Sequence, residues 1–491
     1  MTNANPLKLK DAKLFRQQCF VAGEWVDADN GKTVAVTNPA TGETIGTVPV
    51  CGTAETLRAI EAADKAQQQW RDVPAKERGA VLRKLNDLML ANVDDLALLM
   101  TSEQGKPLAE AKGEIAYAAS FIEWFAEEAR RTYGDIIPTP ASDRRLMAIR
   151  QPVGTTAAIT PWNFPTAMLT RKAGPALAAG CSMVVKPATQ TPFSALAFAE
   201  LADRAGVPKG LLSVLSGSAK EIGGEMTRNP LVKKLSFTGS TEVGRLLMKQ
   251  SADTIKKLSL ELGGNAPFIV FDDADLDAAV EGVMISKYRN TGQTCVCANR
   301  IYVQRPVLKS FTDKLVAKVK AMKVGPGTEA GVVAGPLIDK HALAKVEEHI
   351  ADARKKGAEV LVGGKPHALG GLFFQPTVLS GATADMLVAR EETFGPLAPL
   401  FAFDTDDEAI AQANDTEFGL AAYFYARDIG RVMRVAERLE SGMVGINTGL
   451  ISTAEAPFGG VKQSGLGREG SKYGLDEYME IKYLCFGGIP M

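Results

Sequence analysis

The chain has 491 residues, of which 46% are apolar and 23% are charged, and its formal net charge is −1. These values are typical of a globular protein with more than one domain. The small net charge argues against nucleic acid or an anionic membrane surface as a partner. No apolar stretch is long enough to span a membrane, and no secretory signal is visible, so we expect a cytoplasmic protein.

The six cysteines, at positions 19, 51, 181, 295, 297 and 485, are too scattered to predict a disulfide framework. The sequence contains no Cys-x-x-Cys pair. Its three histidines, at positions 341, 349 and 367, lie well downstream of the neighbouring thiols at 295 and 297. We therefore expect no metal site.

Residues up to about 130 are predicted to form strands followed by helices. The stretch 20–50 alternates apolar and polar residues around Asp-Asn-Gly and Ala-Thr-Gly, which is typical of β-hairpins. The stretches 53–72 and 75–105 carry apolar residues at helical spacing, and the second is expected to end at Gly105.

Residues 150–262 alternate strand, loop and helix, which indicates parallel α/β units. Short apolar strands are expected at 154–160, 182–187 and 234–239. A helix is expected between Thr191, as its N-cap, and Gly206, with Pro192 in its first turn.

A second α/β run follows from about residue 266. Strands are expected at 299–304, 358–364 and 419–426, and a helix at 341–357. The tail 477–488 alternates like a final strand and can pair with the isolated strand at 144–154. Both of these strands are candidates for an interface with another subunit.

Cys295 is the first candidate for catalysis. It follows Gly292 and Gln293 in the polar stretch "YRNTGQTCVCANR", which also holds Cys297. A thiol nucleophile needs access, ionisation and hydrogen-bond donors for the oxyanion it creates. Packing is the alternative, because cysteine is among the most buried residue types. We favour function for Cys295 and packing for Cys297.

Glu261 is the second candidate, in the stretch "LELGGNAPFIVFDD". A carboxylate at the end of an apolar segment is partly desolvated, which raises its pKa toward that of a general base. A solvated glutamate in an ion pair is the alternative. The base is favoured because Gly263 and Gly264 follow Glu261 and permit a close approach of backbone.

Two stretches after predicted strands offer polar groups. In "TPWNFPT" the Asn163 amide, beside Trp162, can donate to an oxyanion, or it can satisfy its own turn. Lys186 stands at the end of a strand, where α/β sheets bind ligands. A surface lysine is the alternative there.

Two further stretches suit a nucleotide. Gly239 and Ser240 precede a helix, whose free N–H groups can bind pyrophosphate, although the spacing is not G-x-G-x-x-G. In "REETFGPLAP" the Glu392 carboxylate can hold ribose hydroxyls and Phe394 can flank a flat ring. A structural turn is the alternative.

Taken together, the motifs are distinctive. "TPWNFP", "KPATQTP", "FTGS", "LELGGNAPFIVFDDADLD", "GQTCVCANR", "EETFGP", "GINTG" and "PFGGVKQSGLGREG" stand in the order found in the aldehyde dehydrogenase superfamily. The chain resembles that superfamily over nearly its whole length. It is most similar to the bacterial NADP-dependent members that oxidise succinate semialdehyde, through "LFRQQ", "EQGKPLAEAKGEI", "ASFIEWFAEEA" and "EIKYLC".

The resemblance implies an α/β, aldehyde dehydrogenase-like fold. Residues 1–133 and 152–263 would form a Rossmann-type cofactor domain, residues 264–470 an α/β catalytic domain, and residues 134–151 and 471–491 a small β oligomerisation element. It also implies a homotetramer built as a pair of dimers, and 4-aminobutyrate degradation as the metabolic context.

The resemblance also implies a mechanism. The Cys295 thiolate attacks the aldehyde carbon, and the Asn163 amide and the Cys295 N–H hold the oxyanion. Loss of hydride to the nicotinamide leaves an acyl group on the sulfur. Glu261 then activates the water that hydrolyses this thioester.

The implied cofactor residues come from several stretches: Trp162 and Asn163 at the mouth, Lys186, Pro187, Ala188 and Thr189 at the adenosine ribose, Gly239 and Ser240 at the pyrophosphate, Leu262 near the nicotinamide, and Glu392 with Phe394 at its ribose. NAD-preferring relatives commonly carry a glutamate at the position of Thr189, which repels a 2′-phosphate. A neutral hydroxyl there, with Lys186 nearby, favours NADP, and NAD is expected to be a weaker substitute.

The implied substrate residues are Arg171, Arg289 and Ser452, which match the contacts to a distal carboxylate. Surface ion pairs are the alternative for each arginine taken singly. Glutarate semialdehyde, one methylene longer, or a broader range of semialdehydes is an alternative substrate, because pockets discriminate one methylene only modestly. An alternative of another class is a nicotinamide-independent thiol esterase that uses Cys295 and Glu261.

In some relatives the thiol equivalent to Cys297 forms a reversible disulfide with the nucleophile. A disulfide between residues i and i+2 is strained and therefore labile. We keep this redox role as a hypothesis beside packing.

Overall fold

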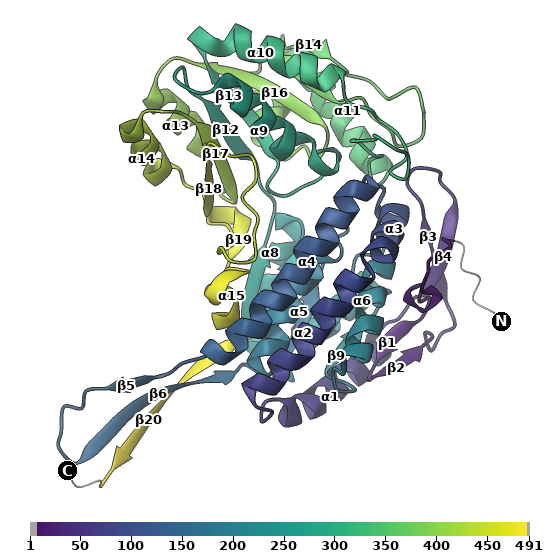
Figure 1. The fold of residues 1–491 in the computed structure, drawn as a ribbon, viewed down its shortest axis with the longest axis vertical. Coiled ribbons are helices and arrows are strands. Elements are labelled where there is room, and N and C mark those ends of the chain that lie inside the picture. The colour runs from purple at the N-terminus through teal and green to yellow at the C-terminus, as the bar shows by residue number, and fades with distance from the viewer. Residues whose placement is uncertain (1–6, 489–491) are drawn as a thin grey trace.

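The structure, a computed structural model, describes residues 7–488. Two α/β lobes lie one above the other, and a long arm of strands projects from the lower lobe (Figure 1). Within the described residues the strands form sheets of eight, seven, three and two strands. The α/β fold predicted from the sequence is confirmed.

The lower lobe is built on the eight-stranded sheet, in the order β19-β11-β10-β7-β8-β9-β1-β2. The strands from β11 to β9 in this order are parallel to their neighbours. At the two sides of this group, β19 pairs with β11 and β1 pairs with β9, both antiparallel. The strands are β1 (Cys19–Val21), β2 (Glu24–Val26), β7 (Thr155–Ile159), β8 (Ser182–Lys186), β9 (Leu212–Val214), β10 (Val232–Thr238), β11 (Lys257–Glu261) and β19 (Gly465–Leu466). The separate hairpin is β3 (Thr33–Thr37) with β4 (Thr44–Pro49).

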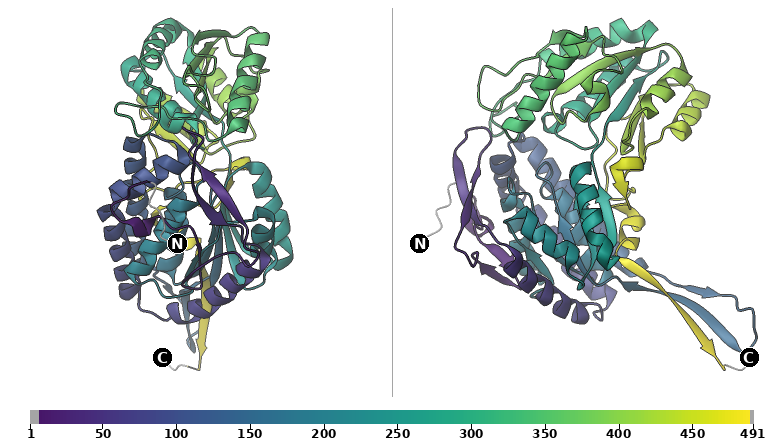
Figure 2. Two further views of the ribbon diagram at one scale, coloured as in Figure 1. Left: turned by 90° about the vertical axis from the view of Figure 1, so that its right-hand side faces the viewer. Right: turned by 180° about the vertical axis from the view of Figure 1, so that it is seen from behind.

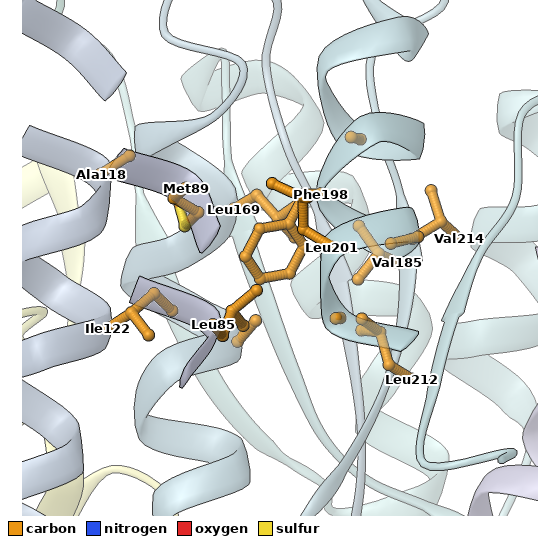
Figure 3. Packing of buried hydrophobic residues seen from close by; sticks show 14 of the residues in the cluster. Leu85, Met89, Ala118, Ile122, Leu169, Val185, Phe198, Leu201, Leu212 and Val214 are labelled. Carbon is orange, nitrogen blue, oxygen red and sulfur yellow. The ribbon is translucent and has the colours of Figure 1, made fainter. Parts of the chain in front are cut away.

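Helices cover both faces of this sheet, as expected for parallel strands joined by crossovers. One side carries α2 (Ala75–Ala91), α3 (Val93–Gln104), α4 (Leu108–Glu128), α5 (Ala167–Ala179) and α6 (Pro192–Ala205); the other carries α1 (Thr53–Trp70), α7 (Ala219–Arg228) and α8 (Thr241–Ser251). Figure 3 shows how side chains of α2, α4, α5 and α6 meet those of β8 and β9 in the first core.

The upper lobe is built on the seven-stranded sheet, in the order β14-β15-β16-β13-β12-β17-β18, with only β14 antiparallel to its neighbour. Its strands are β12 (Ala266–Val270), β13 (Ala298–Gln304), β14 (Glu359–Val362), β15 (Thr377–Ser380), β16 (Leu397–Phe403), β17 (Ala421–Tyr425) and β18 (Met443–Ile446). Its helices are α9 (Leu276–Tyr288), α10 (Arg305–Lys320), α11 (Lys340–Lys355), α12 (Leu387–Arg390), α13 (Asp406–Asn414) and α14 (Ile429–Arg438).

The arm consists of β5 (Asp135–Ile137), β6 (Arg144–Pro152) and β20 (Met479–Gly487). β20 pairs with β6 antiparallel along its whole length, from Met479 opposite Pro152 to Gly487 opposite Arg144. The pairing predicted between the tail and the strand at 144–154 is thus confirmed. Figure 2 shows the arm extending away from both lobes, and α15 (Ser471–Asp476) packs at its base against the lower lobe.

Two details differ from the sequence prediction. The segment 75–105 is two helices, because Asn92 leaves the helical conformation at φ −109° and ψ 19°; its end at Gly105, with φ +95°, is as predicted. Thr191 stands at the N-cap of α6 but its side chain accepts no capping bond. The Glu103 carboxylate of α3 accepts the N–H groups of Phe193 and Ser194 instead, both at 2.8 Å.

None of the helices between residues 7 and 488 combines the length and the apolar character that a membrane span requires.

Candidate active site

The predicted site residues of the lower lobe lie at the carboxyl ends of its parallel strands. The Trp162-Asn163 loop follows β7, Lys186 ends β8, Gly239 follows β10 and Glu261 ends β11. Ligands bind at this edge of an open α/β sheet. The upper lobe meets it with the segments before β13 and β16, which carry Cys295 and Glu392.

A cavity of about 210 Å³ lies between the lobes. It is lined by the predicted residues Trp162, Asn163, Gly239, Ser240, Glu261, Leu262, Cys295, Glu392 and Phe394, and also by Pro161, Thr238 and Gly263. The structure therefore brings together predicted residues from both lobes in one cavity. The other predicted site residues do not line this cavity; they are Arg171, Lys186, Pro187, Ala188, Thr189, Arg289 and Ser452.

The loop that presents Cys295 has an unusual backbone. After α9 it makes a short 3₁₀ turn, Arg289–Gly292, in which Asn290, Thr291 and Gly292 have φ values of +51°, +57° and +76°. Non-glycine residues rarely adopt this left-handed conformation, and such strain gathers at functional sites. A Cβ at Gly292 would lie 2.2 Å from the Gly395 carbonyl oxygen, so only glycine fits.

Cys295 itself is half-buried, and loss of water raises the pKa of its thiol to about 12. The positive charge of Arg171 opposes this rise, whereas Glu392 and Glu261 add to it. Gly264 passes so close that a Cβ there would lie 2.5 Å from the Cys295 carbonyl oxygen. The close backbone approach predicted for the glycine pair is confirmed.

Glu261 is only 3% exposed, and neither of its carboxylate oxygens has a hydrogen-bond partner among residues 7–488. Burial raises the pKa of Glu261 well above its usual range, and the negative charge of Glu469 raises it further. Glu469 is held in turn by ion pairs with Arg171 and Lys172. An unpartnered buried carboxyl in a cavity is available to a water or a substrate.

The side chain of Asn163 is fixed at both ends. Its Nδ2 donates to the Gln293 carbonyl at 3.1 Å, and its Oδ1 accepts the Phe164 N–H at 3.1 Å. An amide carries two N–H groups, so one remains for a ligand.

The nucleotide stretches offer a cation, a carboxylate and free N–H groups. Burial lowers the pKa of Lys186 to about 8. Among residues 7–488 its Nζ donates only to the Pro187 carbonyl, at 3.0 Å. Ser240 caps α8, and its Oγ accepts the Val243 N–H at 3.4 Å. A Cβ at Gly239 would lie 2.4 Å from the Phe237 ring, so a larger residue where the chain turns would displace that ring.

On the other side of the cavity, the Glu392 carboxylate accepts the Gly264 N–H at 3.2 Å, and burial raises its pKa to about 7. The rings of Trp162 and Phe394 meet edge to face at 5.5 Å between centroids. With the helix N-terminus of α8, these groups fit a nicotinamide dinucleotide: an aromatic wall, a carboxylate for hydroxyls and donors for phosphate.

The predicted carboxylate-binding residues differ in their surroundings. Arg171 is buried, pairs with Glu469 at 2.8 Å and stacks on Phe458 at 3.7 Å, yet its Nη2 has no acceptor among the described residues. Arg289 lies over the Phe164 ring at 5.3 Å and forms no ion pair within residues 7–488. Surface ion pairing, the alternative for these arginines, is not seen for Arg289 within residues 7–488.

Tyr117 of α4 is a residue that the sequence did not single out. Its hydroxyl is buried without a hydrogen-bond acceptor or donor of suitable geometry in the described chain, and Ser452 lies against it. Burial raises the pKa of Tyr117, and the charges of Arg171 and Arg289 oppose the rise. On a helix rich in apolar residues, no sequence signal distinguishes Tyr117 from a core aromatic.

Cys297 is a buried free thiol. Lys287 Nζ donates to its sulfur at 3.3 Å, and the thiol donates to the Lys287 carbonyl at 3.4 Å. A disulfide with Cys295 would require Cys297 to leave these partners. Its redox role stays a prediction.

Comparisons with known proteins agree with this site. The family model described as "Aldehyde dehydrogenase family" matches residues 25–484. Glutarate-semialdehyde dehydrogenase of Pseudomonas aeruginosa is 70% identical over 483 residues, which cover 98% of this chain and all of that protein. Succinate-semialdehyde dehydrogenase [NADP(+)] of Escherichia coli is 66% identical over 481 residues, with coverage of 98% and 100%.

Among solved structures, a succinate-semialdehyde dehydrogenase from Burkholderia pseudomallei superposes with a TM-score of 0.97 at 67% identity, covering 98% of this chain and 100% of that one. Fold and sequence thus agree over nearly the whole length. The chain belongs to the aldehyde dehydrogenase family.

Proposed function

We propose that the protein oxidises succinate semialdehyde to succinate with NADP. The observation that carries the substrate is a pair of arginines near the thiol: the charges of both Arg171 and Arg289 oppose the rise in the pKa of Cys295. Arg289 forms no ion pair within residues 7–488, although its charge also acts on the buried carboxyl of Glu110. An unpaired cation close to a nucleophile suits an aldehyde with an anionic tail. Both relatives named above act, by their names, on such semialdehydes.

The reaction needs water and one equivalent of NADP for each aldehyde. Cys295 attacks the aldehyde carbon as a thiolate, while the free N–H of Asn163 and the Cys295 backbone N–H stabilise the oxyanion. NADP, when bound, supplies the acceptor for the hydride that leaves this carbon. Glu261 then takes a proton from the water that attacks the thioester, and the acid leaves.

The proposed cofactor contacts follow the strand ends. Lys186, with Pro187, Ala188 and Thr189, would hold the adenosine ribose and its 2′-phosphate; Gly239 and Ser240 would hold the pyrophosphate; and Trp162, Leu262, Glu392 and Phe394 would surround the nicotinamide and its ribose. The buried amino group of Lys186 forms no ion pair in the part of the chain that the structure describes, which supports a phosphate ligand there.

Arg289→Ala should raise KM for succinate semialdehyde by about 30-fold, because a charged hydrogen bond to the distal carboxylate is lost. KM for an uncharged aldehyde of similar length should change by less than about threefold, since the same bond is absent there. Steady-state kinetics with both substrates measures the difference.

Arg289→Lys should recover part of the loss, and Arg305→Ala, which removes an exposed arginine paired with Asp404, should change neither KM. Equal losses on the charged and uncharged aldehydes would contradict the role of Arg289 in substrate choice.

Thr189→Glu should reduce kcat/KM for NADP by about 100-fold and leave that for NAD within about threefold, because a carboxylate repels the 2′-phosphate but can accept ribose hydroxyls. Initial rates with both cofactors test this. A variant that still prefers NADP would show that another residue sets the preference.

Glutarate semialdehyde is a second candidate substrate, favoured by the 70% identity to a glutarate-semialdehyde dehydrogenase. Rates on a panel of aldehydes with and without a distal carboxylate, each with NADP and NAD, distinguish the two. Ester hydrolysis without nicotinamide reduction would instead support the thiol esterase alternative.

Other parts of the proposal rest on the family resemblance. They are a homotetramer of two dimers, a cytoplasmic location, a part in 4-aminobutyrate degradation, and the division into cofactor, catalytic and oligomerisation parts. For the oligomer, the arm adds support, because Ile136, Ile481, Tyr483 and Phe486 expose apolar side chains along it.

A further inference from the structure

We infer that Asn290 is a positioning residue, which fixes two loops relative to each other. They are the oxyanion loop, residues 160–166, which carries Asn163, and the nucleophile loop, residues 289–297, which carries Cys295. The inference rests on the proposed function, because it assumes that the Asn163 amide stabilises the oxyanion formed at Cys295. Asn290 does not itself line the cavity; it acts through its contacts with Asn163, which does, and with Gln293.

The Asn290 side chain joins the two loops directly. Its Nδ2 donates to the Asn163 carbonyl and to the Gln293 carbonyl, both at 3.1 Å. The same Gln293 carbonyl accepts the Nδ2 of Asn163 at 3.1 Å. The oxyanion amide is therefore anchored on a carbonyl two residues before Cys295, and Asn290 fixes that carbonyl together with the Asn163 backbone.

Asn290 is itself fixed on every side. Gln104 Nε2 donates to its Oδ1 at 3.0 Å, and Glu110 accepts its backbone N–H at 2.8 Å. Its carbonyl accepts both the backbone N–H and the side-chain amide of Gln293, at 3.1 Å each. Because the Oδ1 must face Gln104, the amide can present its two N–H groups only to the carbonyls of the two loops.

Lys106 makes a second contact with the oxyanion loop. Lys106 Nζ donates to the Asn163 carbonyl at 2.8 Å and is ion-paired with Glu114, with both side chains buried. Glu114 also accepts the N–H groups of Thr166 and Ala167 where α5 begins. The oxyanion loop is thus tied to α4, so a change at Asn290 shifts the nucleophile loop against it rather than moving both together.

The backbone of Asn290 provides a clean variant. Its φ of +51° is left-handed, a conformation that glycine adopts without strain. Asn290→Gly therefore removes the side-chain bonds and keeps the turn. Asn447 is a matched control: its φ is +53°, and within residues 7–488 its side chain bonds only to Ala426, at 2.9 Å and 3.0 Å.

The test is a double-mutant cycle read by single-turnover formation of NADPH. Asn290→Gly should slow this step by about 30-fold, because a misplacement of about 1 Å in a reacting group costs up to 100-fold. The affinity for NADP and the KM for the semialdehyde should change by less than about threefold. In the Asn163→Ala background, Asn290→Gly should add less than about threefold, because the amide it aligns is gone.

Asn447→Gly should leave the single-turnover rate within about twofold. The inference is overturned if Asn290→Gly keeps the parental rate, or if its factor is as large with Asn163→Ala as without it. A parental rate for Asn163→Ala alone would instead refute the oxyanion role in the proposed function. The two failures are therefore distinguishable.

Discussion

Cys295→Ser should lower the turnover of succinate semialdehyde by at least about 10⁴-fold, comparable to the loss of a catalytic nucleophile in other enzymes. A serine hydroxyl ionises far less readily than a thiol, and its acyl ester is harder to hydrolyse than a thioester. Loss of water already raises the pKa of the Cys295 thiol to about 12, so an alcohol in the same place would have no accessible anion. Initial rates of NADPH formation measure the loss.

The raised pKa of Cys295 can be tested separately, by the pH dependence of its reaction with an alkylating reagent. Below that pKa the thiolate fraction grows about tenfold for each pH unit, so alkylation of the cofactor-free protein by iodoacetamide should accelerate tenfold between pH 7 and pH 8. Cys181→Ser, which changes another buried thiol, should keep full turnover. Undiminished turnover by Cys295→Ser would refute the whole mechanism.

Much of the site could be predicted because its residues follow local patterns. A strand that ends in Glu261 and continues in two glycines, or a strand that ends in Lys186, is recognisable within a few residues. Such a position predicts the edge of a parallel sheet and therefore a ligand. The order of the motifs along the chain indicates the family resemblance, which implies the reaction mechanism.

What could not be predicted depends on contacts between distant segments. Asn290 and Glu110 are 180 residues apart, and Gln104 reaches Asn290 from 186 residues away. Thr191 has the residue type of an N-cap, yet the buried Glu103 carboxylate satisfies the first N–H groups of α6. In each case tertiary packing determines which group becomes the hydrogen-bond partner. The local sequence indicates only that a polar group needs a partner.

Glu261 and Glu103 illustrate how environment separates two buried carboxyls. Both have a raised pKa, and that of Glu103 is about 8. Glu103, however, accepts two backbone N–H groups, whereas Glu261 has no partner among residues 7–488 and faces the cavity. Only Glu261 is free to exchange a proton with water, which is why a general base is assigned there.

Glu261→Gln should convert steady turnover into a burst of about one NADPH per active site, followed by a rate about 10³-fold lower than that of the parent. Attack by Cys295 and loss of hydride do not require Glu261, so the acyl group accumulates on the sulfur. Stopped-flow absorbance measures the burst, and mass spectrometry of the quenched protein measures the acyl adduct. Hydroxylamine, which cleaves thioesters without a general base, should restore part of the turnover.

The raised pKa of Glu261 predicts how thioester hydrolysis and stability of the parent enzyme change with pH. The base must be ionised, and its pKa is raised, so hydrolysis of the thioester should increase with pH well above the usual carboxyl range. Because the folded protein binds this proton more tightly than the unfolded chain, stability contributed by protonated Glu261 is lost as pH rises through that window. Glu261→Gln should therefore have a Tm at pH 8 no lower than that of the parent.

Glu103→Gln is the matched control for Glu261→Gln, because it alters a buried carboxyl away from the cavity: it should lower Tm and leave the hydrolysis step unchanged. Absence of a burst in Glu261→Gln, with full turnover retained, would assign the water-activating role to another group. If Glu103→Gln also gave a burst, the loss of any buried carboxyl would impair hydrolysis. A burst confined to Glu261→Gln ties the second half of the reaction to a carboxyl beside the thiol that has no hydrogen-bond partner among residues 7–488.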